Sequence, residues 1–247
     1  MSAAIVIADL PSPPTGIPSD AETSRADKIV SVAQALLPTL ARGGAIDART
    51  LRAAMETSFG GSDAEGLWTW KDAYEACEAA QVLFLRRFGR TMRAQARDPA
   101  ALGAMLARVA ALLPTQTRRS EDSQALQQFS TPIGLAHVAA AAAAVTPGDL
   151  VLEPSAGTGL LAIFAELAGA HVVLNELADT RADLLGRLFP GVGVTRHDAA
   201  QINDHLDAAV RPSIVLMNPP FSALAGVDGT FPAHLRRQAV VRAGEGG

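Results

Sequence analysis

Residues 150–159 of the chain read LVLEPSAGTG, and this stretch decides the fold. A short apolar run, Leu150 to Leu152, ends in the polar and glycine-rich segment 153–159, and residues 160–167 are continuously good helix formers. An apolar run of this length, bounded by turn residues and followed by a helical segment, predicts a buried strand, a loop and a helix. Gly157 and Gly159 would let the loop turn tightly and approach a ligand closely, which side chains would prevent.

The same pattern repeats three times downstream. Apolar runs at 171–175, 191–196 and 213–217 close on Glu176, on His197-Asp198 and on Asn218-Pro219-Pro220-Phe221. Buried runs that alternate with helical segments predict an α/β fold with a parallel sheet covered on both faces. In such a sheet the ligand binds beyond the carboxyl ends of the strands, where the strand order reverses.

The polar residues at these strand ends suit a nucleoside-like cofactor. A carboxylate after the second strand, here Glu176, can accept both hydroxyls of a ribose. Asp198, after the third strand, can accept a hydrogen bond from the exocyclic amine of a purine. Residues 157–162 also fit the dinucleotide fingerprint with its permitted final alanine, so the loop alone does not choose the cofactor.

The segment 218–221 favours one chemistry, because a dehydrogenase has no use for it. An amine on an aromatic ring is a poor nucleophile, and two acceptors aimed at its hydrogens, the Asn218 side-chain oxygen and the Pro219 carbonyl, favour the tetrahedral nitrogen that attacks a methyl group. Pro219 and Pro220 fix the backbone, so these carbonyls are preorganised. Phe221 offers a flat face on which a flipped base can stack.

Together, the segments 153–159 and 218–221 resemble those of S-adenosylmethionine-dependent amino-methyltransferases acting on adenine N6 or related amines. Residues 128–132, QFSTP, are similar to the segment that in those enzymes precedes the glycine loop and holds the methionine end of the cofactor. More closely, the chain resembles the front end of bacterial strawberry-notch-like proteins, in which a methylase-like domain precedes a helicase. The resemblance covers roughly residues 28–222.

This resemblance implies a Rossmann-like methyltransferase sheet, S-adenosylmethionine as cofactor and an adenine in DNA as substrate. Thr131, Gly157 and Gly159 would receive the methionine part, Glu176 the ribose and Asp198 the adenine. The full cofactor-binding set is Phe129, Thr131, Glu153, Ser155, Gly157, Gly159, Glu176 and Asp198, and the catalytic set is Asn218, Pro219, Pro220 and Phe221. Related motifs also serve enzymes that methylate RNA or a protein glutamine, and a binding module without turnover that serves a fused or separate helicase is a further alternative.

The chain divides by composition into five segments. Residues 1–24 are proline-rich and predict a disordered arm, 25–113 a helical domain, 114–128 a polar linker, 129–222 the methyltransferase-like domain and 223–247 an incomplete tail. A full domain of this kind would continue with about three more strands. We therefore expect a C-terminally truncated sheet, with an unpaired fourth strand, a short helical candidate at 233–241 and little turnover.

In the helical domain the apolar spacing predicts about four helices, one of them from Ala48 to Phe59 with Asp47 as its N-cap. Trp68, Trp70 and Tyr74 are interpreted as core residues rather than as a base-stacking platform. A set of arginines at helical spacing would line one face, either solvated or in contact with phosphates: Arg86, Arg90, Arg93 and Arg97.

Charge and composition limit the remaining function classes. The net charge is −4, and residues 129–221 carry four basic against nine acidic side chains, so a nucleic acid would need contacts from the helical half or from a partner. The single cysteine, Cys77, excludes a disulfide within the chain, and the five histidines show no metal-ligand spacing. The apolar runs are too short to span a bilayer, so we expect no membrane segment and a cytoplasmic location.

Overall fold

The computed structural model describes residues 23–115, 130–218 and 241–242. The N-terminal described part is helical, as predicted: α1 (Arg25–Ala41), α2 (Ala48–Phe59), α3 (Trp70–Gln95) and α4 (Pro99–Ala111). After residue 130 come α6 (Ile133–Ala142), β1 (Leu150–Glu153), α7 (Ala162–Ala168), β2 (His171–Asn175), α8 (Asp179–Leu188), β3 (Val194–Thr195), η1 (Ala199–Gln201), α9 (Ile202–His205), β4 (Ile214–Val215) and β5 (Val241–Arg242).

Local sequence signals explain where these helices begin. The Asp47 side chain accepts the Thr50 amide at the start of α2, and Gly60 ends that helix in the left-handed conformation. Thr69 and Asp72 form a capping box at the start of α3. Asp98 caps α4, with proline at the first helical position.

In the described residues the strands form one sheet in the order β3-β2-β1-β4-β5. β1 pairs in parallel with β2, Leu152 opposite Val173, and with β4, Leu152 opposite Val215. β2 pairs in parallel with β3, and β5 pairs antiparallel with β4. The predicted α/β fold with a parallel sheet is therefore confirmed for β1 to β4.

The expectation that β4 is an unpaired sheet edge is wrong, because Val241 and Arg242 pair with Val215 and Ile214. The helical candidate at 233–241 is also wrong at its last residue, since Val241 lies in a strand. A sheet edge needs only backbone groups from its partner, so a two-residue segment suffices to pair with it.

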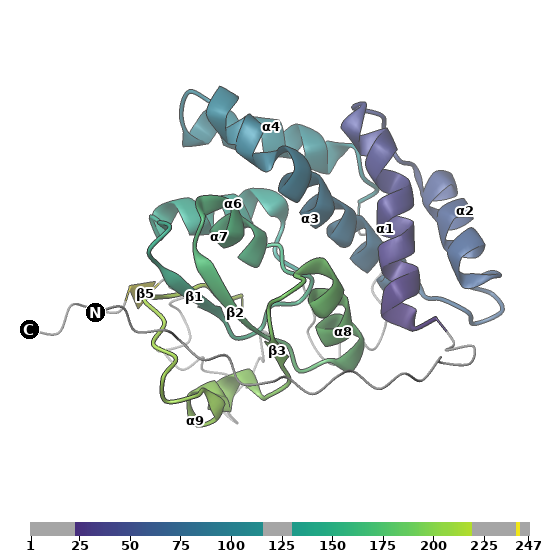
Figure 1. The fold of residues 1–247 in the computed structure, drawn as a ribbon. Helices are drawn as coiled ribbons and strands as arrows, with labels where there is room; N and C mark the ends of the chain where they lie inside the picture. The colour runs from purple at the N-terminus through teal and green to yellow at the C-terminus, as the bar shows by residue number, and fades with distance from the viewer. Residues whose placement is uncertain (1–22, 116–129, 219–240, 243–247) are drawn as a thin grey trace, which may run out of the picture.

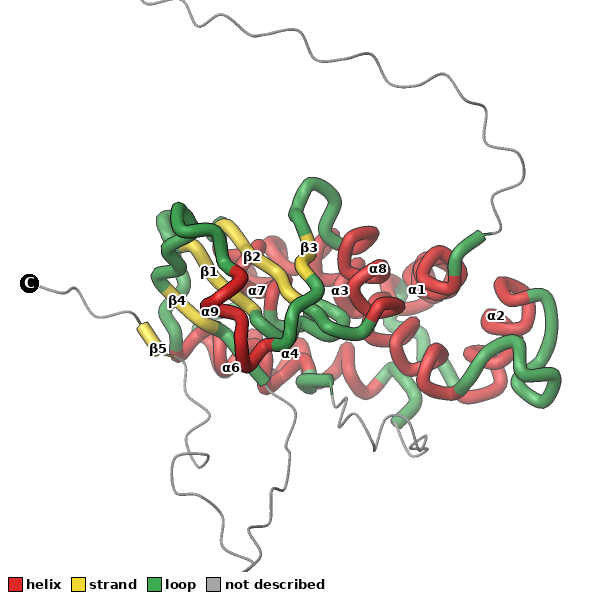
Figure 2. Tube along the Cα trace, turned by 90° about the horizontal axis from the view of Figure 1, so that it is seen from below, coloured by secondary structure: helices red, strands yellow, loops and turns green. Residues whose placement is uncertain are grey.

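The connections place helices on both faces of the sheet. The chain steps from β1 through α7 to β2 and through α8 to β3 in one direction, so right-handed crossovers put both helices on the same face. β4 lies on the other side of β1, and α9, in the connection that returns to it, lies on the opposite face (Figures 1 and 2). Helices α1 and α3 then cover the outer side of α7 and α8 (Figure 1).

One hydrophobic core joins the helical part to the sheet part. Buried residues from α1 and α3, such as Leu36 and Leu85, belong to the same cluster as Ile163 of α7 and Leu185 of α8. Arg86 of α3 adds an ion pair with Glu166 of α7, at 2.8 Å. The helices of residues 25–111 therefore form a third layer behind the sheet, next to the loop that follows β1.

Candidate functional site

The predicted site residues that directly follow described strands lie at the carboxyl ends of the parallel sheet, among them Gly157, Glu176 and Asn218. Because β1 to β4 are parallel, the loop after β1 lies beside Glu176, which follows β2, and the segment after β4, which ends in Asn218. The strand order reverses between β1 and β4, which is where open α/β sheets bind ligands. Asn218 follows β4 by three residues, and β4 is the parallel neighbour of β1.

The two loop glycines have different reasons to be glycine. Both have positive φ, +57° at Gly157 and +83° at Gly159. A Cβ at Gly159 would lie 2.3 Å from the Phe189 ring, so close packing of the loop on α8 excludes any side chain there. At Gly157 the nearest atom would be the Arg181 Nη1, at 3.8 Å, which is an ordinary van der Waals separation, so packing alone does not exclude a side chain there. Of the two glycines, it is Gly159 that close packing requires.

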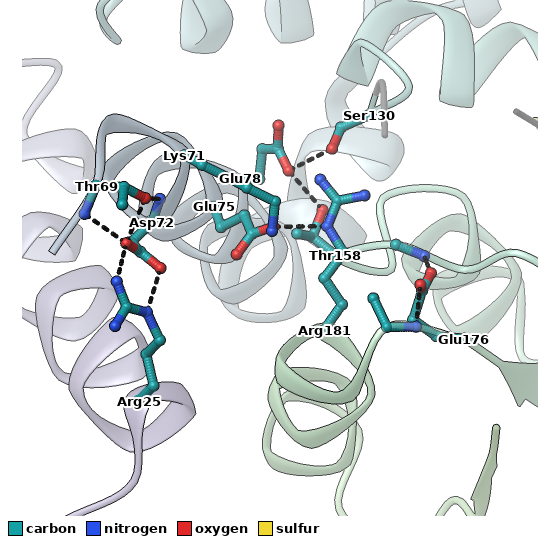
Figure 3. A network of polar contacts seen from close by, with 12 residues as sticks. Arg25, Thr69, Lys71, Asp72, Glu75, Glu78, Ser130, Thr158, Glu176 and Arg181 are labelled. Atoms are coloured by element: carbon teal, nitrogen blue, oxygen red, sulfur yellow. Dashed lines mark hydrogen bonds and ion pairs between the residues drawn. The ribbon is translucent and has the colours of Figure 1, made fainter. Parts of the chain in front are cut away.

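Glu176 holds the glycine loop in place. Its Oε2 accepts the Gly157 amide at 2.8 Å and its Oε1 accepts the Ala178 amide at 3.0 Å (Figure 3). The Gly157 amide is therefore used within the chain. Each carboxylate oxygen can accept a second hydrogen bond, so Glu176 keeps acceptor capacity for a ligand.

Glu153 and Ser155 carry polar atoms that lack partners. The Oε2 atom of Glu153 and the Oγ atom of Ser155 are buried and have no hydrogen-bond partner among the described residues. Burial raises the pKa of Glu153 well above its usual value, and the nearby charge of Glu176 raises it further. Buried unpaired polar groups are rare and mark places where a ligand or an ordered water completes the hydrogen bonding.

Asn175 is an organising residue that the sequence pattern did not single out. It is 1% exposed, and its amide nitrogen donates to the carbonyls of Pro154 and His197, both at 2.8 Å. Its Oδ1 accepts the His197 amide and the Thr195 hydroxyl, each at 2.8 Å. These bonds fix the ends of β1, β2 and β3 to one another. In the sequence, the feature that could have indicated this role is an asparagine at the end of a buried apolar run.

The remaining predicted site residues have fewer contacts with the loop after β1 or lie outside the described part of the chain. Asp198 is exposed and accepts the Ala200 amide at 2.9 Å, so its carboxylate caps η1. Thr131 and Asn218 are half-buried. Four predicted site residues lie outside the described residues: Phe129, Pro219, Pro220 and Phe221.

A buried polar network connects α3 to the glycine loop (Figure 3). Glu78 accepts the Ser130 hydroxyl at 2.6 Å and the Thr158 hydroxyl at 2.9 Å. Glu75 accepts the Arg181 Nε at 2.6 Å and the Lys71 ammonium at 2.7 Å. Sequence reasoning missed this network because Glu78 and Thr158 are far apart in the chain.

The charges of this network keep Arg181 protonated. Burial by itself would lower the pKa of Arg181, but the neighbouring charges of Glu75, Glu78 and Glu176 raise it above its usual value. The network therefore brings carboxylates and a permanent cation together below the glycine loop.

The first of the four arginines predicted to line one helical face, Arg86, makes its hydrogen bonds within the chain. The helix α3 continues through Gly89, but Arg86 donates to both carboxylate oxygens of Glu166 and to the Leu188 carbonyl. Its guanidinium also lies 4.8 Å from the Phe189 ring centroid. The other members of the set are exposed, Arg90 and Arg93 on α3 and Arg97 after the end of this helix.

The aromatic residues of the helical part behave as core. Trp68 is 1% exposed, packs edge-on against Trp70 and donates its ring N–H to the Gly61 carbonyl at 2.9 Å.

The single cysteine, Cys77, is buried. Burial, aided by the charge of Glu78, raises the pKa of the Cys77 thiol to about 12, which fits a packing role.

Two further findings concern metals and membranes. No group of three or more metal-ligating side chains occurs among residues 23–115, 130–218 and 241–242. Within the same ranges, no helix has both the length and the apolar character needed to cross a bilayer.

In comparisons with known proteins, no family model, curated protein or solved structure matches the chain.

Proposed function

We propose that this chain has a Rossmann-like methyltransferase fold and binds S-adenosylmethionine at the carboxyl edge of its sheet. The observation that carries the proposal is the meeting of the glycine loop, Glu176 and the segment ending in Asn218 around the end of β1. The sheet order, with its reversal between β1 and β4, supports a ligand crevice at this place.

The residues at this edge fit such a cofactor. Gly157 has no side chain to cover the loop backbone, and the unpaired atoms of Glu153 and Ser155 offer hydrogen-bonding groups. Glu153, whose pKa burial raises, offers a buried carboxyl with one unpaired oxygen. A nucleoside that carries an amino acid has donors and acceptors for such groups.

In this proposal each residue has a binding role. Thr131 and the Gly157 region receive the methionine part, Glu176 accepts the ribose hydroxyls while it holds the loop, and Asp198 accepts the adenine amine. Gly159 serves through packing on Phe189 rather than through ligand contact. The bound cofactor supplies a methyl group activated by its positive sulfonium.

The proposed substrate is an adenine N6 amine in DNA. Asn218 follows β4, the parallel neighbour of β1, so it offers an acceptor at the carboxyl ends of the strands, where the cofactor is proposed to bind. The Asn218 side-chain oxygen and the Pro219 carbonyl would accept the amine hydrogens, and Phe221 would stack on the flipped base.

Transfer of a radiolabelled methyl group to separate pools of DNA, RNA and protein tests this function. We expect label in DNA, and loss of that label in Asn218→Ala, with the α2 surface variant Glu56→Ala as control. Label only in protein would refute the DNA substrate and point to a glutamine. Cofactor binding without label in any pool would favour a binding module that serves a helicase.

A further inference from the structure

Glu78 connects two segments that the proposed cofactor site needs side by side. Its Oε2 accepts the hydroxyls of both Ser130, at 2.6 Å, and Thr158, at 2.9 Å (Figure 3). Ser130 directly precedes Thr131, and Thr158 lies between the two positive-φ glycines of the loop. One oxygen atom of α3 therefore fixes the separation of the two segments proposed to hold the methionine end.

Two of the three residues in this connection are buried. Glu78 is 4% exposed and Thr158 is 1% exposed, so water does not replace the carboxylate readily. A buried hydroxyl that loses its acceptor either destabilises the folded chain or turns to another partner, and this turn moves its backbone segment. Removal of Glu78 would therefore shift the loop at Thr158 relative to Thr131.

Arg181 extends the same arrangement to Gly157. Its side chain is 7% exposed, and its Nε is held by Glu75, one helical turn before Glu78 on α3. Its Nη1 lies 3.8 Å from the position that a Gly157 Cβ would occupy. Glu75 thus holds Arg181 of α8 close to Gly157, next to the loop residue Thr158 that Glu78 holds.

We propose that Glu78 is a positioning residue for the methionine end of the cofactor, acting through Ser130 and Thr158. This inference rests on the proposed function and deepens it, because it makes the helical part a support of the cofactor site. It predicts a selective effect. Loss of Glu78 weakens ligands that carry the amino-acid portion and spares ligands that consist of the nucleoside alone.

Titration calorimetry with two ligands tests this selectivity. S-adenosylmethionine carries the amino-acid portion, and methylthioadenosine keeps the nucleoside and sulfur but lacks that portion. For Glu78→Ala we expect the dissociation constant of S-adenosylmethionine to rise by about tenfold or more, as for loss of a charge-assisted hydrogen bond, and that of methylthioadenosine by less than about threefold. Glu78→Gln, which keeps one acceptor oxygen, should recover part of the affinity.

The matched control is Glu166→Ala. Glu166 also accepts a hydrogen bond across the contact between the helical part and the sheet part, but from Arg86 and away from the glycine loop. It should lower the melting temperature without changing the ratio of the two affinities. If Glu78→Ala does not fold, Thr158→Val removes one of the two donors and should change the ratio in the same direction.

The results separate this inference from the proposed function. Equal weakening of both ligands, no weakening, or the same ratio in Glu166→Ala would refute the role of Glu78 and leave cofactor binding intact. Absence of S-adenosylmethionine binding in the unaltered chain would refute both.

Discussion

Substitution of the second loop glycine, Gly159→Ala, should destabilise the chain strongly. The new Cβ would lie 2.3 Å from one Phe189 ring atom and 2.9 Å from another. The ring cannot move aside easily, because it is 1% exposed and the Arg86 guanidinium lies against it. Overpacking of this kind costs about 1–3 kcal/mol and a left-handed alanine costs about 1–2 kcal/mol, so we expect a loss of about 2–5 kcal/mol.

Gly157→Ala is the matched comparison. Gly157 lies in the same loop and also has a positive φ, but a Cβ added there would lie 3.8 Å from its nearest atom. Only the conformational cost of about 1–2 kcal/mol applies. Urea unfolding of both variants, followed by circular dichroism, measures the difference. Equal losses of unfolding free energy in the two variants would refute the packing role of Gly159.

Three further changes test separate parts of the structure. Burial raises the folded-state pKa of Glu153 above the ordinary 4.5, so the unaltered chain should lose stability as the pH rises from there through the folded-state pKa. Glu153→Gln cannot ionise at this position. The unfolding free energy of this variant, measured with urea between about pH 5 and pH 8, should therefore depend less on pH than that of the unaltered chain. Arg86→Ala, which removes the ion pair with Glu166, should cost about 1–3 kcal/mol in thermal unfolding, while the exposed Arg90→Ala should stay within about 0.5 kcal/mol. Asn175→Ala should cost about 2–4 kcal/mol, because it leaves buried backbone groups unpaired, and unchanged hydrogen-exchange protection at the His197 amide would contradict its role.

Local signals in the sequence were sufficient for most individual elements. The bounds of α2 and β2 match the predicted ranges 48–59 and 171–175, because caps and buried apolar runs are encoded by neighbouring residues. The third and fourth strands are shorter than predicted, 194–195 and 214–215. Apolar runs extend past the last paired residue, so they predict where a strand lies better than where its pairing ends.

Contacts between distant residues could not be predicted in this way. Arg86 looks like any solvated helix arginine until Glu166 and Leu188, far along the chain, come beside it. Glu78 carries no motif, and its importance depends on meeting Ser130 and Thr158 in space. These pairings depend on how the helical layer packs on the sheet, which a local pattern does not contain.

The site residues show the same division. The positions of Glu176 and the glycine loop at neighbouring strand ends followed from the strand pattern. The partners of Glu176 did not, because its bonds to the Gly157 and Ala178 amides depend on the loop conformation. The roles of the two glycines also separated only when Phe189 was seen to pack against Gly159.

Isothermal titration of the intact chain with S-adenosylmethionine tests the proposed cofactor site most directly. We expect saturable binding with one ligand per chain. Glu176→Ala should weaken it by about tenfold or more, because the variant loses both the ribose acceptor and the bonds that hold the loop, whereas Glu56→Ala on α2 should bind as the unaltered chain does. No heat above the dilution background with folded protein, or undiminished affinity in Glu176→Ala, would contradict the assignment.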